Sequence, residues 1–293
     1  MPSTREIRRR IRSVENTAKI TNAVQLVAAS KMRRAQMRAE AARPYAESMR
    51  GLLANLAGAG GDGQDPGPLH PLLERREVGK TAIILITPDR GLAGGLISNL
   101  QRHAGSLVLS PDQGGDVSMI PVGRKGLDYF ARFDVPFRGE FQRLGDYPSL
   151  DDTRPISQIA IQDYMRGEVD QVSLVYAAFV STVQQRPTTV PLLPVEAPAS
   201  DDGDAAAEVE YIFEPSPEAV LDDLLPRYVE MQVYQAVLES AASEQSARMV
   251  AMRNATDAAN EMVGDLTLQY NKARQEQITS ELLDIVGGVE AMA

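Results

Sequence analysis

The chain has 293 residues, of which 43% are hydrophobic and 24% charged, with a formal net charge of −10. This is the composition of an ordinary globular protein with about two domains. The absence of cysteine excludes disulfides, zinc–cysteine sites, iron–sulfur clusters and thiol catalysis. Because no run of about 18 apolar residues occurs, we expect membrane association only through a partner.

Residues 1–57 are expected to form the first half of a coiled-coil shaft, as one long helix. Ser3 suits the N-cap and Glu6 follows at the spacing of a capping box, whereas Pro44 predicts a kink. Apolar residues recur in steps of four and three at Ile7, Ile11, Val14, Ala18, Thr21, Gln25, Ala28, Met32, Ala35, Ala39, Ala42, Ala46, Met49, Leu53 and Leu56, where only the threonine and the glutamine are polar. Such a stripe lets a helix supercoil with a second one.

Residues 58–79 predict a flexible linker, because they begin with a glycine-rich run and continue through three prolines. From residue 80 onward, strand and helix patterns alternate. The expected elements are strands at Thr81–Thr87, Val117–Val122 and Gln171–Val180, and helices from Leu96, after the Gly123–Gly126 turn and over Pro155–Arg166. This order predicts a central three-layer α/β (Rossmann-like) domain with a mostly parallel sheet over residues 80–215, with an exposed acidic loop at 196–210.

Residues 216–293 predict the second half of the shaft. Ser216 suits the cap and Pro217 the first helical position. Pro226 is expected to bend the helix, and the Gly287–Gly288 pair to end it. The apolar stripe is expected at Met252, Ala255, Ala259, Met262, Leu266, Tyr270 and Ala273. Residues 1–50 hold twelve basic and four acidic residues (+8) and residues 216–293 five basic and thirteen acidic (−8), so the two helices should attract each other.

The sequence predicts no catalytic, cofactor or metal site. The glycine-rich turn Asp89–Gly95 lacks the lysine of a phosphate-binding P-loop and the dinucleotide fingerprint, which favours a tight turn. His70 and His103 have no second ligand at metal spacing, and no Ser/His/Asp set is present. A nucleic-acid partner is not expected, because the basic N-terminal run faces its own acidic partner helix and has few aromatics.

Five stretches resemble the gamma subunit of F-type, proton-translocating ATP synthase. They are Asp89–Leu96, Ile20–Gln36, Ser243–Ala259, Tyr270–Gln275, and Ile278–Leu282 with Ile285–Gly288. The resemblance covers nearly the whole chain. It implies an antiparallel coiled-coil shaft threaded through a ring of alpha and beta subunits, with the α/β domain against the epsilon subunit and the c-subunit ring.

The resemblance also implies a function. The chain would be a non-catalytic rotor subunit without cofactor, coupling proton translocation through the membrane sector to ATP synthesis or hydrolysis in the beta subunits. It would be a peripheral membrane protein through its complex. The arginine-rich start is not followed by an apolar core and is interrupted by Glu6 and Glu15, so we expect no presequence and place the protein at the cytoplasmic face of a bacterial plasma membrane.

Single residues match family contact positions. Arg274 and Gln275 match a pair that hydrogen-bonds a beta-subunit loop, and arginine suits this because its planar fork can hold a carboxylate. The other implied contacts to the catalytic ring are Thr279, Glu281, Ile285, Val286, Val24 and Ala93, and those of the foot near the c ring and epsilon are Tyr211 and Glu214. Val24 stands where many relatives have methionine, and Ala93 where cysteine is frequent.

Two other interpretations stay open at this point. One is an α/β enzyme with helical arms, which nucleotide binding by the isolated chain would favour. The other is a self-associating coiled-coil scaffold, which predicts stable homodimers in sedimentation.

Overall fold

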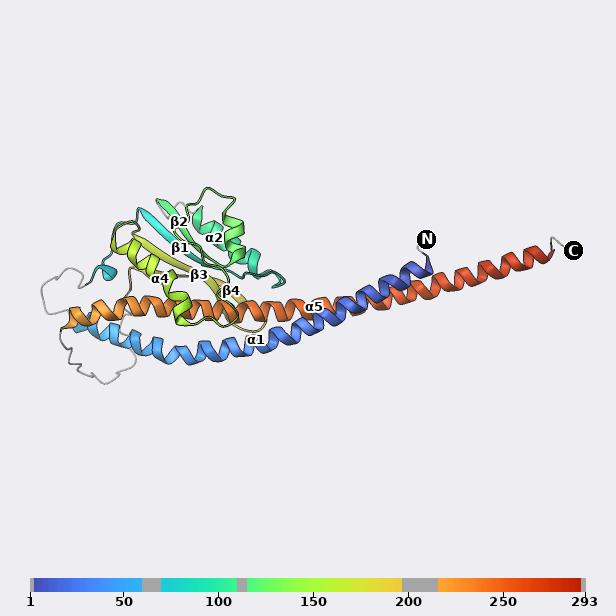
Figure 1. Cartoon of the computed structure of the whole chain (residues 1–293), viewed down its shortest axis with the longest axis horizontal. Helices are drawn as coiled ribbons and strands as arrows, with labels where there is room; N and C mark the ends of the chain where they lie inside the picture. Colours follow the sequence, from blue (N-terminus) through green and yellow to red (C-terminus); the bar gives the residue numbers. More distant parts are fainter. Residues whose placement is uncertain (1–2, 60–69, 110–114, 197–215, 291–293) are drawn as a thin grey trace. The chain divides into compact units, whose positions relative to one another are not determined.

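The computed structural model describes residues 3–59, 70–109, 115–196 and 216–290. Its two compact units are residues 1–29 with 248–293, and residues 30–247 (Figure 1). The elements are α1 (Thr4–Ala59), a short 3-10 turn (Pro71–Leu73), β1 (Lys80–Ile86), α2 (Leu96–Val108), β2 (Asp116–Val122), α3 (Arg124–Phe130), α4 (Leu150–Met165), β3 (Gln171–Phe179), β4 (Gln185–Leu193) and α5 (Pro217–Glu290). Residues 60–69 of the predicted linker and nearly all of the predicted acidic loop, together with Tyr211 and Glu214, lie outside the described residues.

The unit of residues 30–247 is built on a four-stranded sheet in the order β2-β1-β3-β4. β1 pairs in parallel with β2 and β3, whereas β4 runs antiparallel to β3. The predicted α/β class with a mostly parallel sheet is therefore confirmed. The sequence reading missed β4, because Pro187 and Pro191 argue against a strand; β4 is an edge strand, where a missing N–H is tolerated.

Side chains of β1 alternate between two apolar layers, as a strand requires. Ala82, Ile84 and Ile86 face a core shared with α4 and the first part of α5. Ile83 and Leu85 face the opposite core, and α2 and α3 lie on that side of the sheet (Figure 1). The sheet is thus covered on both faces, which confirms the three-layer prediction.

Two helix ends differ from expectation. α4 begins at Leu150 and not at Pro155, because Ser149 caps it and forms a reciprocal capping box with Asp152. α5 does not end at the Gly287–Gly288 pair but continues to Glu290. A helical glycine costs about 1 kcal/mol relative to alanine, which weakens a long helix without terminating it.

The predicted stripe of α1 is confirmed: each of its positions with a described side chain is buried or half-buried. In α5 one predicted position is wrong. Met262 is 52% exposed, and Val263 is the half-buried residue. The buried or half-buried positions include Met252, Thr256, Ala259, Val263, Leu266, Tyr270 and Ala273, which alternate strictly by four and three, as a coiled-coil seam requires. The predicted position Ala255 is half-buried beside this set, as is Ala251. None of the described helices combines the length and apolarity needed to span a bilayer.

Candidate functional site

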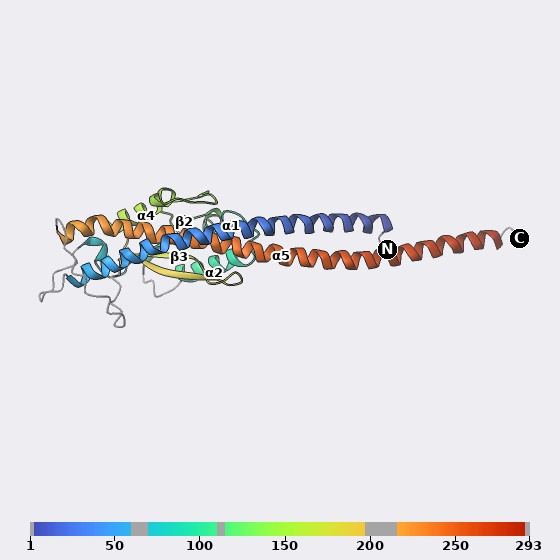
Figure 2. The same ribbon diagram turned by 90° about the horizontal axis from the view of Figure 1, so that it is seen from below.

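The unit of residues 1–29 and 248–293 is an antiparallel helix pair. The hydroxyls of Thr21 and Thr256 lie 2.6 Å apart, and the Thr4 hydroxyl donates to Gln277 at 3.2 Å. Partner numbers on α5 rise as those on α1 fall, so the helices run in opposite directions. Figure 1 and Figure 2 both show α1 alongside α5 in this unit.

Small side chains form the seam of this pair. Extending the Thr21–Thr256 register by equal steps sets Ala18 opposite Ala259, and both are buried. Two facing alanines let the backbones approach closely. Further toward the N-terminus, the Arg8 guanidinium donates to the Tyr270 hydroxyl and lies 5.2 Å from the ring centroid, a cation–π contact. The pair therefore buries a narrow stripe and leaves most of its surface open.

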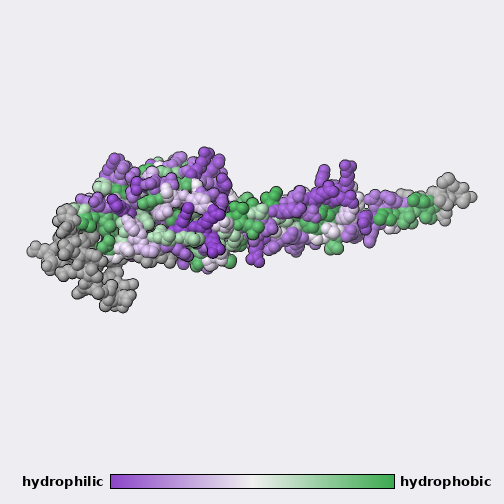
Figure 3. All heavy atoms as spheres, turned by 60° about the horizontal axis from the view of Figure 1, so that its bottom comes forward, coloured by the Kyte–Doolittle hydropathy of each residue, from purple (hydrophilic) through white to green (hydrophobic). Residues whose placement is uncertain are grey.

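The end of α5 has no α1 residue beside it within the described chain. α1 begins at Thr4, next to Gln277, whereas α5 continues through residues 278–290, about 20 Å at 1.5 Å per residue. The large apolar side chains here are 48–66% exposed; they are Ile278, Leu282, Leu283, Ile285 and Val286. Figure 3 shows apolar surface near the C-terminal end of α5. An exposed apolar surface of this kind marks an interaction site.

The body of the helix pair also exposes large apolar residues outside the seam. They are Ile20, Leu26 and Val27 on α1 and Met262 and Leu268 on α5. The sequence did not predict them as contact residues. Met262 was predicted to lie in the seam, and the other four are apolar positions that the seven-residue repeat leaves outside the seam. Together with the end of α5, they give the helix pair apolar residues both in the seam between the helices and on its exposed surface.

Four predicted polar contact residues lie on exposed positions of α5 just before and within this end. Arg274, Gln275, Thr279 and Glu281 are all exposed. Glu281 accepts a hydrogen bond from the Gln277 side chain at 2.9 Å. Neither the Arg274 nor the Gln275 side chain forms a hydrogen bond or ion pair within the described part of the chain, so both side chains are available to another polypeptide.

The two remaining described contact residues lie elsewhere. Val24 is half-buried on α1. Ala93, in the turn after β1, is 1% exposed and packs with Leu96, Leu100, Ala177 and Ala247. The exposed apolar side chain of that turn is Leu92, at φ +65°, a conformation that residues other than glycine rarely adopt.

The histidines have structural roles. His70 is buried; its Nδ1 accepts the Leu72 backbone N–H at 3.0 Å, and its Nε2 lies 3.4 Å from Asp222. Burial lowers the pKa of His70, and the nearby Asp222 carboxylate opposes this only in part. The accepted N–H at Nδ1 also requires a neutral ring. His103 contacts the Thr189 hydroxyl at 2.8 Å. Across the described ranges, no three His, Asp or Glu side chains are grouped so that they could hold a metal ion.

These features define a class: a subunit of a larger assembly, whose long paired terminal helices expose apolar surface to other polypeptides. A sequence model of the family described as ATP synthase matches residues 3–292. The ATP synthase gamma chain of Dehalococcoides mccartyi is 54% identical over 296 residues and is covered along the whole of both chains.

The ATP synthase gamma chain of Chloroflexus aurantiacus is 48% identical over 298 residues, covering 100% of this chain and 99% of the relative. A chain in the structure of Euglena gracilis mitochondrial ATP synthase, OSCP/F1/c-ring, rotational state 3, matches with a TM-score of 0.66 at 21% identity, over 99% of this chain and 94% of that chain. The chain belongs to the ATP synthase gamma-chain family.

Proposed function

We propose that the chain is the central rotor shaft of an ATP synthase, coupling proton translocation through the membrane sector to ATP synthesis or hydrolysis in the beta subunits. The observation that carries this proposal is the end of α5, residues 278–290, which is helical, apolar and without a described α1 residue beside it. Such an end suits a sleeve formed by other subunits, here the ring of alpha and beta subunits.

An apolar end suits rotation for a physical reason. Hydrophobic contact is non-directional, so a smooth apolar surface can turn in its sleeve without deep angular minima. Directional hydrogen bonds would create such minima. The polar positions Arg274, Gln275, Thr279 and Glu281 would supply the angle-dependent contacts to the ring, because their side chains are exposed and charge-assisted hydrogen bonds are geometrically specific.

An asymmetric shaft acts on the ring by differential contact. A binding site changes its population only if the shaft interacts unequally with its conformations, and a shift from 1:99 to 99:1 needs about 5.5 kcal/mol of such bias. The polar contacts and steric wedging by a stiff helix pair would supply it. The subunit itself would be non-catalytic and would hold no cofactor.

The other segments of the chain have roles in the same rotor. Residues 1–57 and 216–293 form the shaft, 58–79 a linker, and 80–215 the central domain with its acidic loop at 196–210. Tyr211 and Glu214 belong to the foot, which contacts the epsilon subunit and the c-subunit ring. Val24 and the turn containing Ala93 contact the catalytic ring, with Leu92 as the exposed apolar side chain of that turn. The protein would lie peripherally at the cytoplasmic face of a bacterial plasma membrane.

A charge placed on the apolar end tests the proposal. Co-expression with alpha and beta subunits, followed by measurement of ATP-driven rotation, should show that Val286→Glu or Ile285→Glu weakens torque or assembly, because the buried carboxylate would lose its hydration. Leu109→Glu is the matched control, since Leu109 is also an exposed apolar residue but lies at the end of α2. Normal assembly and torque in both end variants would contradict the sleeve.

The polar contacts have their own test. Arg274→Ala should weaken assembly or ATPase-driven torque, whereas Lys272→Ala, another exposed cation two residues earlier, should have little effect. Equal turnover in the two variants would remove Arg274 from the contact set. Stable homodimers of the pure chain that persist when alpha and beta subunits are added would instead favour a self-associating scaffold.

A further inference from the structure

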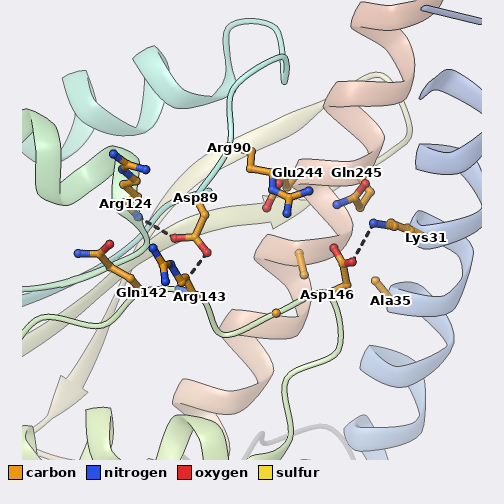
Figure 4. A pocket seen from close by; sticks show the side chains of 12 residues that line it. Lys31, Ala35, Asp89, Arg90, Arg124, Gln142, Arg143, Asp146, Glu244 and Gln245 are labelled. Carbon is orange, nitrogen blue, oxygen red and sulfur yellow. Dashed lines mark hydrogen bonds and ion pairs between the residues drawn. The ribbon is translucent and has the colours of Figure 1, made fainter. Parts of the chain in front are cut away.

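A cavity of about 370 Å³ lies within the unit of residues 30–247 (Figure 4). Asp89 and Arg90 enter its wall from the turn after β1, and Arg124 from the start of α3, directly after β2. The cavity therefore opens at the carboxyl ends of two parallel strands. This is the edge at which open α/β sheets bind ligands, and its volume is in the range of small-molecule sites.

Three arginines from separate segments line this cavity. Arg90, Arg124 and Arg143 all line it. In Figure 4, Arg143 lies beside Asp89 and Arg90 beside Glu244, while the Arg124 side chain extends away from Asp89. Arg124 has only a long pair to Asp128, at 3.6 Å between exposed side chains. Ion pairs of Arg90 or Arg143 are absent among the described residues. The guanidinium groups are thus available for an added anion.

The carboxylates of the wall are already engaged. The two oxygens of Asp89 accept the backbone N–H groups of Arg124 and Arg143, at 2.9 and 3.0 Å, and Asp146 pairs with Lys31 at 2.8 Å. Glu244 on α5 completes the lining, which holds four cations and three carboxylates. Asp89 acts as a positioning residue, because its two hydrogen bonds fix the backbone of two of the three arginines.

Backbone conformation points to the same place. Arg143 (φ +58°) and Leu92 (φ +65°) are the non-glycine residues with positive φ in the described chain, and they lie in the two loops that Asp89 joins. Such a conformation costs about 1 kcal/mol or more in a residue with a Cβ and is kept where the surroundings enforce it. Glycine would satisfy the turn at less cost, so arginine at position 143 favours a role for its side chain.

We propose that this cavity binds a phosphate-bearing anion, either inorganic phosphate or the terminal phosphate of a nucleotide. Guanidinium groups hold phosphate oxygens through paired, charge-assisted hydrogen bonds, and three such groups from different loops can surround a tetrahedral anion. The site would bind phosphate through arginine side chains. It does not need a P-loop, a motif that the glycine-rich turn does not have. The proposal does not rest on the rotor role. Because it predicts nucleotide binding by the isolated chain, hydrolysis of the bound nucleotide, and not binding alone, would favour the α/β enzyme with helical arms.

Calorimetric titration of the full-length chain tests this proposal with inorganic phosphate, ADP and adenosine, at an ionic strength fixed with chloride. We expect phosphate and ADP to bind one site and adenosine to give no heat. Binding should weaken about tenfold in Arg143→Gly and in Arg90→Gln, since each removes a charged hydrogen-bonding partner. ADP affinity well above that of phosphate would assign the site to a nucleotide, and equal affinities would assign it to free phosphate.

The variants are chosen so that loss of folding cannot imitate loss of binding. Arg143→Gly keeps the positive φ without its steric cost, and circular dichroism should show unchanged helix content. Arg102→Gln, an exposed arginine on α2 away from the cavity wall, is the control and should bind as the parent chain does. Absence of heat above the chloride blank, or unchanged affinity in both Arg143→Gly and Arg90→Gln, would overturn the proposal.

Discussion

The two units differ in how much apolar surface they bury for themselves. The unit of residues 30–247 has continuous cores on both faces of its sheet. In the paired-helix unit, the buried apolar side chains of the described residues are Ile7, Ala18, Ala28, Met252 and Ala259, three of them alanine. Ordering a residue costs about 1–2 kcal/mol in backbone entropy alone, so this narrow seam cannot stabilise the pair alone, whereas the α/β unit carries its own core.

The helix pair, and not the α/β unit, is therefore the part that needs external subunits. An isolated helix gains little stability from propensity, and tertiary packing of an apolar face supplies the rest. The paired helices have a second apolar set on the outside, including Leu26 and Leu268. We therefore expect the helix pair to gain most of its stability in the assembled complex and the α/β unit to gain little.

The largest expected effect is a cavity in the self-sufficient unit. Ile84 is fully buried in the centre of the sheet, so Ile84→Ala should destabilise that unit by about 2–5 kcal/mol. Near-ultraviolet circular dichroism of its tyrosines, followed during thermal unfolding, measures the loss. Met165→Ala, at an exposed position on α4, should change the midpoint little. A similar loss in both variants would mean that the sheet core is not what stabilises the unit.

An intermediate effect is expected when a larger side chain is placed in the seam of the paired helices. Ala18→Leu inserts a branched side chain opposite Ala259, where the helices approach closely, and should cost about 1–3 kcal/mol. Helix content followed by circular dichroism during heating gives the change. Ala23→Leu lies on the exposed side of the same helix and should be neutral. A stabilised Ala18→Leu would show that the seam has room and that alanine is not required there.

Local patterns allowed much of this architecture to be predicted. The stripe of α1 has a period that only a paired helix explains, and the apolar run of β1 reads directly as a buried strand. Met262 was assigned wrongly to the seam because hydrophobicity alone does not fix the phase of a repeat; Val263, one residue on, is equally apolar. β4 was not predicted because its prolines are tolerated only in an edge strand. Whether a strand lies at the edge depends on the whole sheet and cannot be read from the segment alone.

The candidate sites also depend on the tertiary arrangement, which local sequence patterns do not give. The exposed end of α5 depends on where α1 begins opposite it, a fact about two segments that lie far apart in sequence. The meeting of Arg90, Arg124 and Arg143 depends on sheet order, which sets the ends of β1 and β2 side by side. Sequence identified the turn after β1 as special but gave no means to find its partners.

A smaller, pH-dependent effect is expected at His70 in the α/β unit. Since burial lowers its pKa, the unfolded chain takes up a proton more readily than the folded chain. Stability should thus be constant above the unfolded pKa of about 6.5 and should fall as pH decreases below it. Thermal midpoints measured in steps between about pH 5 and 8 will show the slope.

The matched variant is His70→Asn, which keeps a side-chain acceptor for the Leu72 N–H but does not titrate. It should lose the slope near pH 6 while retaining the fold. His103→Asn, a substitution of the chain's other histidine, is the control. A slope that persists in His70→Asn would assign the pH dependence to other groups.

The smallest expected effect concerns an exposed ion pair within the α/β unit. Lys31 on α1 pairs with Asp146 at 2.8 Å, with side chains 28% and 48% exposed, so Asp146→Asn should cost below about 1 kcal/mol, and less at high salt. Urea unfolding at low and high ionic strength measures both. Asp128→Asn, which removes the longer pair to Arg124, should cost nothing. A salt-independent loss well above this limit would mean that the Lys31–Asp146 pair behaves as a buried ion pair that holds α1 against the loop carrying Asp146. The stability of the unit would then depend on α1 as well as on its sheet core.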